Sequence, residues 1–156
     1  MSHIGLEETL LGGQSFSWTA TTASSWKGVI DKSVVELRLS EEKLEWRTGK
    51  KCPFTSNKLR DYLWLDPSFT EAIDSLPWRS DPVLDRCMKK LSGLRILRQP
   101  MDEVLLVFLL SSVKSIPQIK EMKELVAKKY GEPLELGLWS FPGWEKLAEI
   151  PEAELR

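Results

Sequence analysis

The hydrophobic pattern of this 156-residue chain changes its period once, at about Pro53, and this change constrains the fold more than any other feature. Before it, short runs such as Val34–Leu39 and Leu44–Arg47 alternate apolar and polar residues. After it, apolar residues recur with the spacing of a helix face. Alternation predicts half-buried strands, and the longer spacing predicts helices packed through one face. The sequence therefore predicts an α+β protein, with an antiparallel sheet in residues 1–53 and a helical region in residues 54–156.

The N-terminal part, from about Leu6 to Thr48, predicts an antiparallel β-meander with one buried face. Two polar stretches, Asp31–Ser33 and Ser40–Glu42, separate the alternating runs and predict tight turns. Gly12 and Gly13 interrupt the first run. Glycine at such a place permits a β-bulge or the close approach of another group to the backbone.

The helical part carries clear start signals, because Ser, Thr and Asp cap helices and Pro favours the first turn. We expect helices to begin at Thr55 or Ser56, Asp66-Pro67, Asp81-Pro82, Pro100 and Ser115. The helix after Pro100 is apolar nearly all round as far as Leu110, which predicts a central, buried position. Asp102 and Glu103 form either a carboxylate pair or the acidic first turn that stabilises a helix start.

The charge of the chain limits its partners. The formal net charge is −1 and the sequence pI is about 6.0, whereas a freestanding nucleic-acid-binding domain is usually basic. Between Val113 and Tyr130, five lysines and two glutamates give a local excess of +3. This segment either contacts phosphates or is an ordinary solvated helix face. We therefore expect any binding of double-stranded DNA by this chain alone to be weak.

Metal, cofactor and membrane roles are not predicted. Cys52 and Cys87 lie far apart in the sequence and His3 is the only histidine, so a zinc site would lack ligands. The longest apolar run, Val104–Leu110, is too short to span a bilayer, and the N-terminus lacks the pattern of a signal peptide. We therefore expect no cofactor, no metal and no membrane partner. The expected location is intracellular and soluble: cytoplasmic, or nuclear in a eukaryote.

Five short motifs occur in an informative order. They are Gly13–Phe16 with Trp18, similar to GQSFRW; Trp26–Val29, similar to WxGV; Tyr62–Asp66, similar to KYFxLD; Gly93–Gln99, similar to GVRLLRQ; and Phe141-Pro142 before a Leu-Ala helix. Together they resemble the 8-oxoguanine DNA glycosylase family over most of the chain. The resemblance implies a twisted antiparallel sheet followed by an incomplete α-helical glycosylase-type domain.

The resemblance also implies a function, namely the N-terminal portion of a base excision repair DNA glycosylase that acts on oxidised guanine (8-oxoguanine). That family is a DNA N-glycosylase and AP lyase. Its helix-hairpin-helix, its Schiff-base lysine and its aspartate have no match before Arg156. We therefore expect the helical region to stop before the hairpin, with no catalytic residue in this chain and no activity alone. Damaged double-stranded DNA and a C-terminal glycosylase half are the implied partners.

Gly13 is the one substrate-binding residue that the resemblance implies. In the family, the matching glycine accepts a hydrogen bond from N7–H of 8-oxoguanine through its carbonyl, and guanine lacks that hydrogen. The lesion must leave the duplex stack to be reached, and a residue without a Cβ lets a flat base approach the backbone. The alternative is that Gly12 and Gly13 only form a β-bulge.

The turn from Ser111 to Ser115 matches the family's SSNNN, which implies DNA contacts for Val113, Lys114, Ser115 and Gln118. Val113 stands where the family has the asparagine that fills the space left by the flipped base. Gln118 stands where it has an arginine that reads the opposite cytosine, and Lys114 contacts phosphate instead. These departures predict altered recognition of the opposite base.

Two other functions stay open at this stage. The chain is either a non-catalytic DNA- or protein-binding module, which includes one half of a split glycosylase, or a plain domain with an unrelated partner. A downstream hairpin with lysine and aspartate would distinguish the enzyme from the module.

Overall fold

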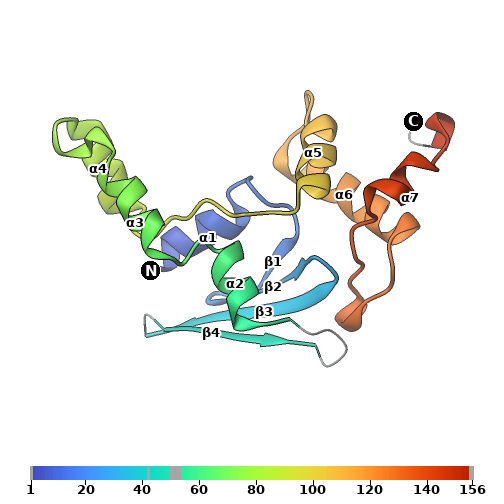
Figure 1. Ribbon diagram of the computed structural model, residues 1–156, viewed down its shortest axis with the longest axis horizontal. Helices are drawn as coiled ribbons and strands as arrows, with labels where there is room; N and C mark the ends of the chain where they lie inside the picture. Colours follow the sequence, from blue (N-terminus) through green and yellow to red (C-terminus); the bar gives the residue numbers. More distant parts are fainter. Residues whose placement is uncertain (1, 42, 50–53, 155–156) are drawn as a thin grey trace.

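A computed structural model describes residues 2–41, 43–49 and 54–154 (Figure 1). The first elements are α1 (His3–Leu11), β1 (Trp18–Thr22), β2 (Ser25–Ile30), β3 (Ser33–Ser40), β4 (Lys43–Thr48) and α2 (Ser56–Tyr62). They are followed by α3 (Pro67–Asp74), η1 (Pro77–Arg79), α4 (Pro82–Lys90), α5 (Met101–Leu110), α6 (Ile116–Tyr130), η2 (Glu135–Gly137), α7 (Trp144–Ala148) and η3 (Glu152–Glu154), where η denotes a short 3₁₀ turn. A sheet followed by helices confirms the predicted α+β class.

The sheet is a four-stranded antiparallel meander in the order β1-β2-β3-β4, as the alternation predicts. Trp26, Leu37 and Trp46 are cross-strand partners and therefore share one face. Gly28 makes room on that face for the indole of Trp18, because a Cβ at Gly28 would lie only 2.6 Å from the Trp18 ring. Large aromatic side chains thus supply much of the buried surface of the sheet.

Helices α1 and α2 cover this face of the sheet (Figure 1). The buried cluster consists of Leu6, Leu10, Trp18, Trp26, Ile30, Val35, Leu37, Phe54, Leu59, Tyr62, Leu63 and Leu97. The cluster therefore joins the sheet to elements that follow it in the chain. The predicted domain boundary between residues 53 and 54 falls at residues 50–53, outside the described residues, and stays a prediction.

The predicted start of the first strand at Leu6 is wrong, because residues 3–11 form α1. Ser2 caps this helix by accepting a hydrogen bond from the Gly5 amide at 3.0 Å. Leu6 and Leu10, one helical turn apart, are completely buried against the sheet. A short apolar run does not by itself distinguish a strand from a buried helix, and the contact with the sheet decides the outcome here.

Of the two alternatives for Gly12 and Gly13, the β-bulge does not occur. Gly12 is the C-cap of α1, and Gly13 lies in the connection to β1, which begins only at Trp18. The register shift in β1 falls elsewhere, between Ala20 and Thr22. Gly13 has a φ of +98°, a left-handed conformation that favours glycine.

The predicted helix starts are confirmed, and α2, α3 and α4 have side-chain caps. Thr55 accepts from the Lys58 amide at 3.3 Å, and Asp66 and Asp81 cap α3 and α4 in the same way. Helices α3 and α4 extend to one end of the molecule, and α7 lies at the other (Figure 1). An extended segment, residues 94–100, runs from α4 past α1 to the start of α5. This segment carries the Gly93–Gln99 motif into contact with the N-terminal loop.

The predicted central burial of α5 is wrong for the described residues. Only Glu103 and Val107 are buried, while Met101 and Phe108 are 75% and 71% exposed. The reason is that the described elements pack against one side of α5, where Val107 contacts Phe16 and Ile119. The other side of this apolar helix has no covering element among the described residues.

The last elements close one end of the sheet. Helix α6 buries Ile119, Lys123 and Ala127, and Ile119 packs against Phe16 of the N-terminal loop and Val107 of α5. After Gly131 the chain turns back along its own path, since Leu134 donates to Leu138 and Ser140 to Glu132. Among the described residues, no helix is long and apolar enough to cross a membrane.

Candidate functional site

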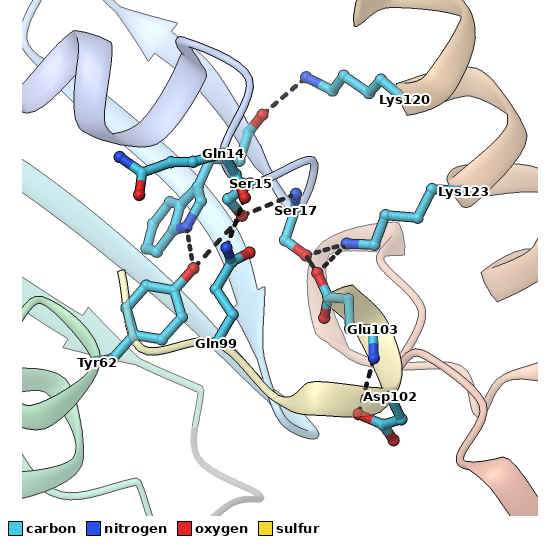
Figure 2. A network of polar contacts seen from close by, with 10 residues as sticks. Gln14, Ser15, Ser17, Tyr62, Gln99, Asp102, Glu103, Lys120 and Lys123 are labelled. Carbon is cyan, nitrogen blue, oxygen red and sulfur yellow. Dashed lines mark hydrogen bonds and ion pairs between the residues drawn. The ribbon is translucent and has the colours of Figure 1, made fainter. Parts of the chain in front are cut away.

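The loop between α1 and β1, residues 12–17, is fastened to the extended segment before α5 (Figure 2). Gln14 donates from Nε2 to the Arg95 carbonyl at 2.7 Å and accepts at Oε1 from the Leu97 amide at 2.9 Å. Gln99 donates from its own Nε2 to the Gln14 carbonyl at 2.5 Å. The side chains of Gln14 and Gln99 thus fix Gln14, the residue that follows Gly13. Two of the five sequence motifs meet at this point in space.

A second set of contacts joins the loop and the start of β1 to Tyr62 of α2. Trp18 donates from its indole to the Tyr62 hydroxyl at 3.0 Å, and Ser15 lies 3.4 Å from the same hydroxyl. Tyr62 is buried, and burial raises its pKa to about 12, because the phenolate would lose its hydration. The neutral phenol is therefore a permanent part of this support.

The third contact is a buried ion pair between α5 and α6. Lys123 Nζ lies 2.6 Å from Glu103 Oε1, and both side chains are less than a tenth exposed. Ser17 donates from its hydroxyl to the same Glu103 oxygen at 2.6 Å and also receives a hydrogen bond from Lys123 (Figure 2). Burial lowers the pKa of Lys123, and the neighbouring Glu103 carboxylate opposes that shift. The ion pair joins α5 to α6, and the hydrogen bonds of Ser17 join the loop to both helices.

These contacts frame a groove of about 240 Å³ between the loop and the two helices. Its lining includes Gly13, Phe16, Val104, Phe108 and Ile116. A Cβ on Gly13 would lie 2.9 Å from Cδ1 of Ile116. The position therefore favours glycine for its left-handed backbone, and a Cβ there would also have to displace the end of the Ile116 side chain.

The turn between α5 and α6 presents the four residues predicted to contact DNA. Val113 is 99% exposed and has a φ of +60°, which is a strained conformation for a β-branched residue. Lys114 and Ser115 are exposed beside it. Gln118 is exposed too, but its Oε1 accepts from the Ser115 amide at 2.9 Å, as in a capping box. The turn thus brings the four residues together, but the Gln118 side chain is already hydrogen-bonded to Ser115 at the start of α6.

The lysine-rich segment is only in part a free cationic face. Lys120 donates to the Trp18 carbonyl at 2.7 Å, and Lys123 is the buried partner of Glu103. Lys129 lies 3.0 Å from Glu154. Of the five lysines, Lys123 and Lys129 have an ion-pair partner among the described residues, and Lys114, Lys120 and Lys128 have none. Only Lys123 is buried, so part of the local positive charge remains at the surface.

Asp102 and Glu103 have different roles, and their two carboxylates do not form a pair. Asp102 accepts from the Glu103 amide at 2.8 Å, as the acidic first turn predicts. Glu103 turns inward to Lys123, which the sequence analysis did not single out. A signal was present, since Lys123 stands between Ile119 and Ala127 at the spacing of the buried stripe of α6. Within the part of the chain that the structure describes, no group of His, Cys, Asp and Glu could hold a metal ion.

The fold and the site together define a sheet-and-helix module that presents a glycine loop to a groove between helices. The sequence model for the N-terminal domain of 8-oxoguanine DNA glycosylase matches residues 1–105. The chain therefore belongs to the 8-oxoguanine DNA glycosylase N-terminal domain family.

Individual relatives agree with this assignment. N-glycosylase/DNA lyase OGG1 of Arabidopsis thaliana is 29% identical over 99% of this chain and 44% of its own length. The structure of MBOgg1 in complex with a low-affinity DNA ligand is 31% identical, with a TM-score of 0.85, over 99% of this chain and 54% of that one. The 8-oxoguanine glycosylase/lyase of Clostridium acetobutylicum, in its apo form, is 28% identical with the same TM-score and coverage. The chain thus spans about half the length of the relatives it matches.

Proposed function

We propose that this chain forms the lesion-recognition part of an 8-oxoguanine DNA glycosylase of base excision repair. The observation that carries the proposal is Gly13, which lines the groove at a φ of +98°, where an added Cβ would lie 2.9 Å from Cδ1 of Ile116. Two glutamines and a buried phenol hold the loop around it. A preorganised loop of this kind suits recognition of a rigid, flat ligand, because little ordering remains to be done on binding.

The discrimination rests on one proton. 8-Oxoguanine carries a hydrogen on N7, whereas guanine has a lone pair there. The Gly13 carbonyl accepts a hydrogen bond from N7–H of 8-oxoguanine and repels the N7 lone pair of guanine. With guanine bound, the carbonyl would be a buried acceptor without a donor, which costs free energy. The base reaches this carbonyl only after it leaves the duplex. We therefore propose that the protein acts in the cytoplasm, or in the nucleus of a eukaryote.

Val113 supplies the contact with the duplex itself. An exposed valine held in a left-handed conformation at the tip of a turn is a costly arrangement that functional sites retain. Apolar side chains of this size act as wedges between base steps. Valine offers no hydrogen bond to the opposite base, so discrimination of that base is relaxed. Lys114 beside it contacts phosphate, and with so few free cations the affinity of the chain alone is low and falls with salt.

The complete enzyme needs a second part, and α5 supplies the surface for it. Five exposed apolar residues follow one another at helical spacing along α5: Met101, Val104, Leu105, Phe108 and Leu109. Two of them, Val104 and Phe108, also line the groove. A stripe of this spacing is the usual docking face of a helix. Its partner is the C-terminal half of a glycosylase, which would bring the nucleophilic lysine. The solved relatives, of which this chain spans about half, support that assignment.

The test combines this chain with the separately produced C-terminal half of the Clostridium acetobutylicum enzyme. We expect the pair to retain duplex DNA containing 8-oxoguanine better than undamaged duplex, and to form a borohydride-trapped adduct on the added half. Gly13→Ala should remove the preference for the lesion, and Gly143→Ala, where an added Cβ meets nothing within 4 Å, should not. A pair that associates without any preference for the lesion would support a non-catalytic binding module instead.

A further inference from the structure

A second cavity lies behind the Gly13 groove, between the first two strands, α6 and residues 137–141. Its volume is about 380 Å³, within the range of about 300–1,000 Å³ typical of small-molecule sites. Phe16 and Glu103 line both this cavity and the groove, so they form the wall between them. The cavity is thus next to the candidate lesion site and separate from it.

The walls of this cavity are held in place before any ligand arrives. On one side, Ser140 is buried and its hydroxyl accepts from the Glu132 amide at 3.0 Å, while Pro133 and Trp139 form an antiparallel bridge. On the other side, the ion pair of Lys123 with Glu103 fixes α6. A cavity with fixed walls loses little conformational freedom on binding, which favours a ligand of defined shape.

The lining combines aromatic surface with free positive charge. Three of its lining residues, Phe16, Trp139 and Phe141, are aromatic. Lys27 of β2 and Lys128 of α6 also line it, and neither has a hydrogen-bond or ion-pair partner among the described residues. Lys123 and Glu103 neutralise each other. One further carboxylate, Glu124, leaves the lysines in excess by one.

We propose that this cavity binds a planar aromatic molecule that carries a phosphate group, of the size of a mononucleotide. The ring stacks on the aromatic wall, as bases stack on aromatic side chains in proteins that bind single strands. The phosphate lies between Lys27 and Lys128, whose ammonium groups bind it as point charges. The proposal does not depend on lesion recognition at Gly13, because the cavity has its own walls and its own cations.

The probe is thymidine 5′-monophosphate, a pyrimidine chosen because the Gly13 groove is proposed to take an oxidised purine. It is titrated into the isotope-labelled full chain, and the amide spectrum is followed by NMR. We expect saturable shifts at Thr19, Lys27, Trp139 and Lys128, with a dissociation constant below about 1 mM, or about −4 kcal/mol. Thymidine and inorganic phosphate, tested separately, should each bind at least about tenfold more weakly.

Matched variants decide which groups hold the probe. Lys27→Gln combined with Lys128→Gln should raise the dissociation constant at least about tenfold, and so should Trp139→Leu in a chain whose spectrum stays folded. Lys90→Gln, at an exposed lysine of α4 outside the cavity, should leave it unchanged. The absence of saturable shifts, shifts confined to Gly13 and Ile116, or an equal effect of Lys90→Gln and the double substitution would overturn the proposal. Equal affinity for inorganic phosphate would do so as well.

Discussion

Lys123 of α6 lies 2.6 Å from the carboxylate of Glu103 on α5, in a place where both side chains are almost fully buried. Ser17 of the N-terminal loop completes the arrangement with a hydrogen bond to the same oxygen. The pair connects the loop that carries Gly13 with the helix that begins beside Val113. It thereby links the two parts of the candidate site, the groove lined by Gly13 and the turn that carries Val113.

Removal of the cation should therefore be costly. Lys123→Met leaves a buried carboxylate unpaired, and we expect a loss of about 3–5 kcal/mol in the free energy of unfolding. The double substitution Lys123→Met with Glu103→Leu should recover most of that loss, because no buried charge remains. Lys128→Met in the same helix serves as control, with an effect within about 0.5 kcal/mol. Urea denaturation measures all three, and a small effect of the single substitution would contradict a buried pair.

Exposure on α5 predicts an unusual contrast between two large apolar residues. Leu10 is fully buried in the sheet core, and Leu10→Ala should cost about 2–5 kcal/mol. Phe108 is 71% exposed, and Phe108→Ala should change stability by no more than about 0.5 kcal/mol. The same Phe108→Ala should weaken binding of the C-terminal half. Equal destabilisation of the isolated chain by both substitutions would show that α5 is covered.

Gly13→Ala should destabilise the protein more than replacement of a glycine by alanine in an ordinary loop. The new methyl group would lie 2.9 Å from Ile116 Cδ1 and would sit on a backbone of φ +98°. We expect a loss of about 1–3 kcal/mol. Adding Ile116→Val, which removes the Cδ1 atom, should recover the steric part of the loss and leave the backbone part. If the second substitution recovers nothing, the groove is not where the clash arises.

Val113→Asn should stabilise the isolated protein. Asparagine tolerates the left-handed region better than valine, whose Cβ is branched. We expect the free energy of unfolding to rise by about 0.5–1 kcal/mol. The same substitution should restore discrimination of the base opposite the lesion in the two-part enzyme, since a hydrogen-bonding side chain returns. Thermal unfolding tests the first expectation, and competition between duplexes with different opposite bases tests the second.

The raised pKa of Tyr62 predicts that the protein loses stability at alkaline pH. Its pKa is about 12 in the folded protein and about 10 in an unfolded chain. The folded state therefore holds the proton longer, so the stabilisation is complete below pH 10 and is lost as the pH rises towards 12. The loss should reach about 2–3 kcal/mol. Because lysines titrate in the same range, the measurement is the difference between the protein and Tyr62→Phe, which should show a flatter decline.

The sequence by itself determined the class of fold and most of its elements. Alternation in residues 33–48 predicted the strands, and the caps at Thr55, Asp66 and Asp81 predicted the helices that they begin. These signals are local: a strand face repeats every two residues, and a cap bonds to an amide two or three residues away. The order of the motifs likewise predicted the family that the comparisons support.

Only the tertiary structure decided the features that depend on distant contacts. Leu6 and Leu10 belong to a helix because a sheet face is there to bury them, and no local pattern states this. The burial of Lys123 and the exposure of Phe108 likewise depend on which elements pack against α6 and α5. Gly13 carried a signal in the sequence, but its place opposite Ile116 arises from packing across about a hundred residues of chain. Burial and charge pairing are properties of the packed arrangement, and the chain order alone does not contain them.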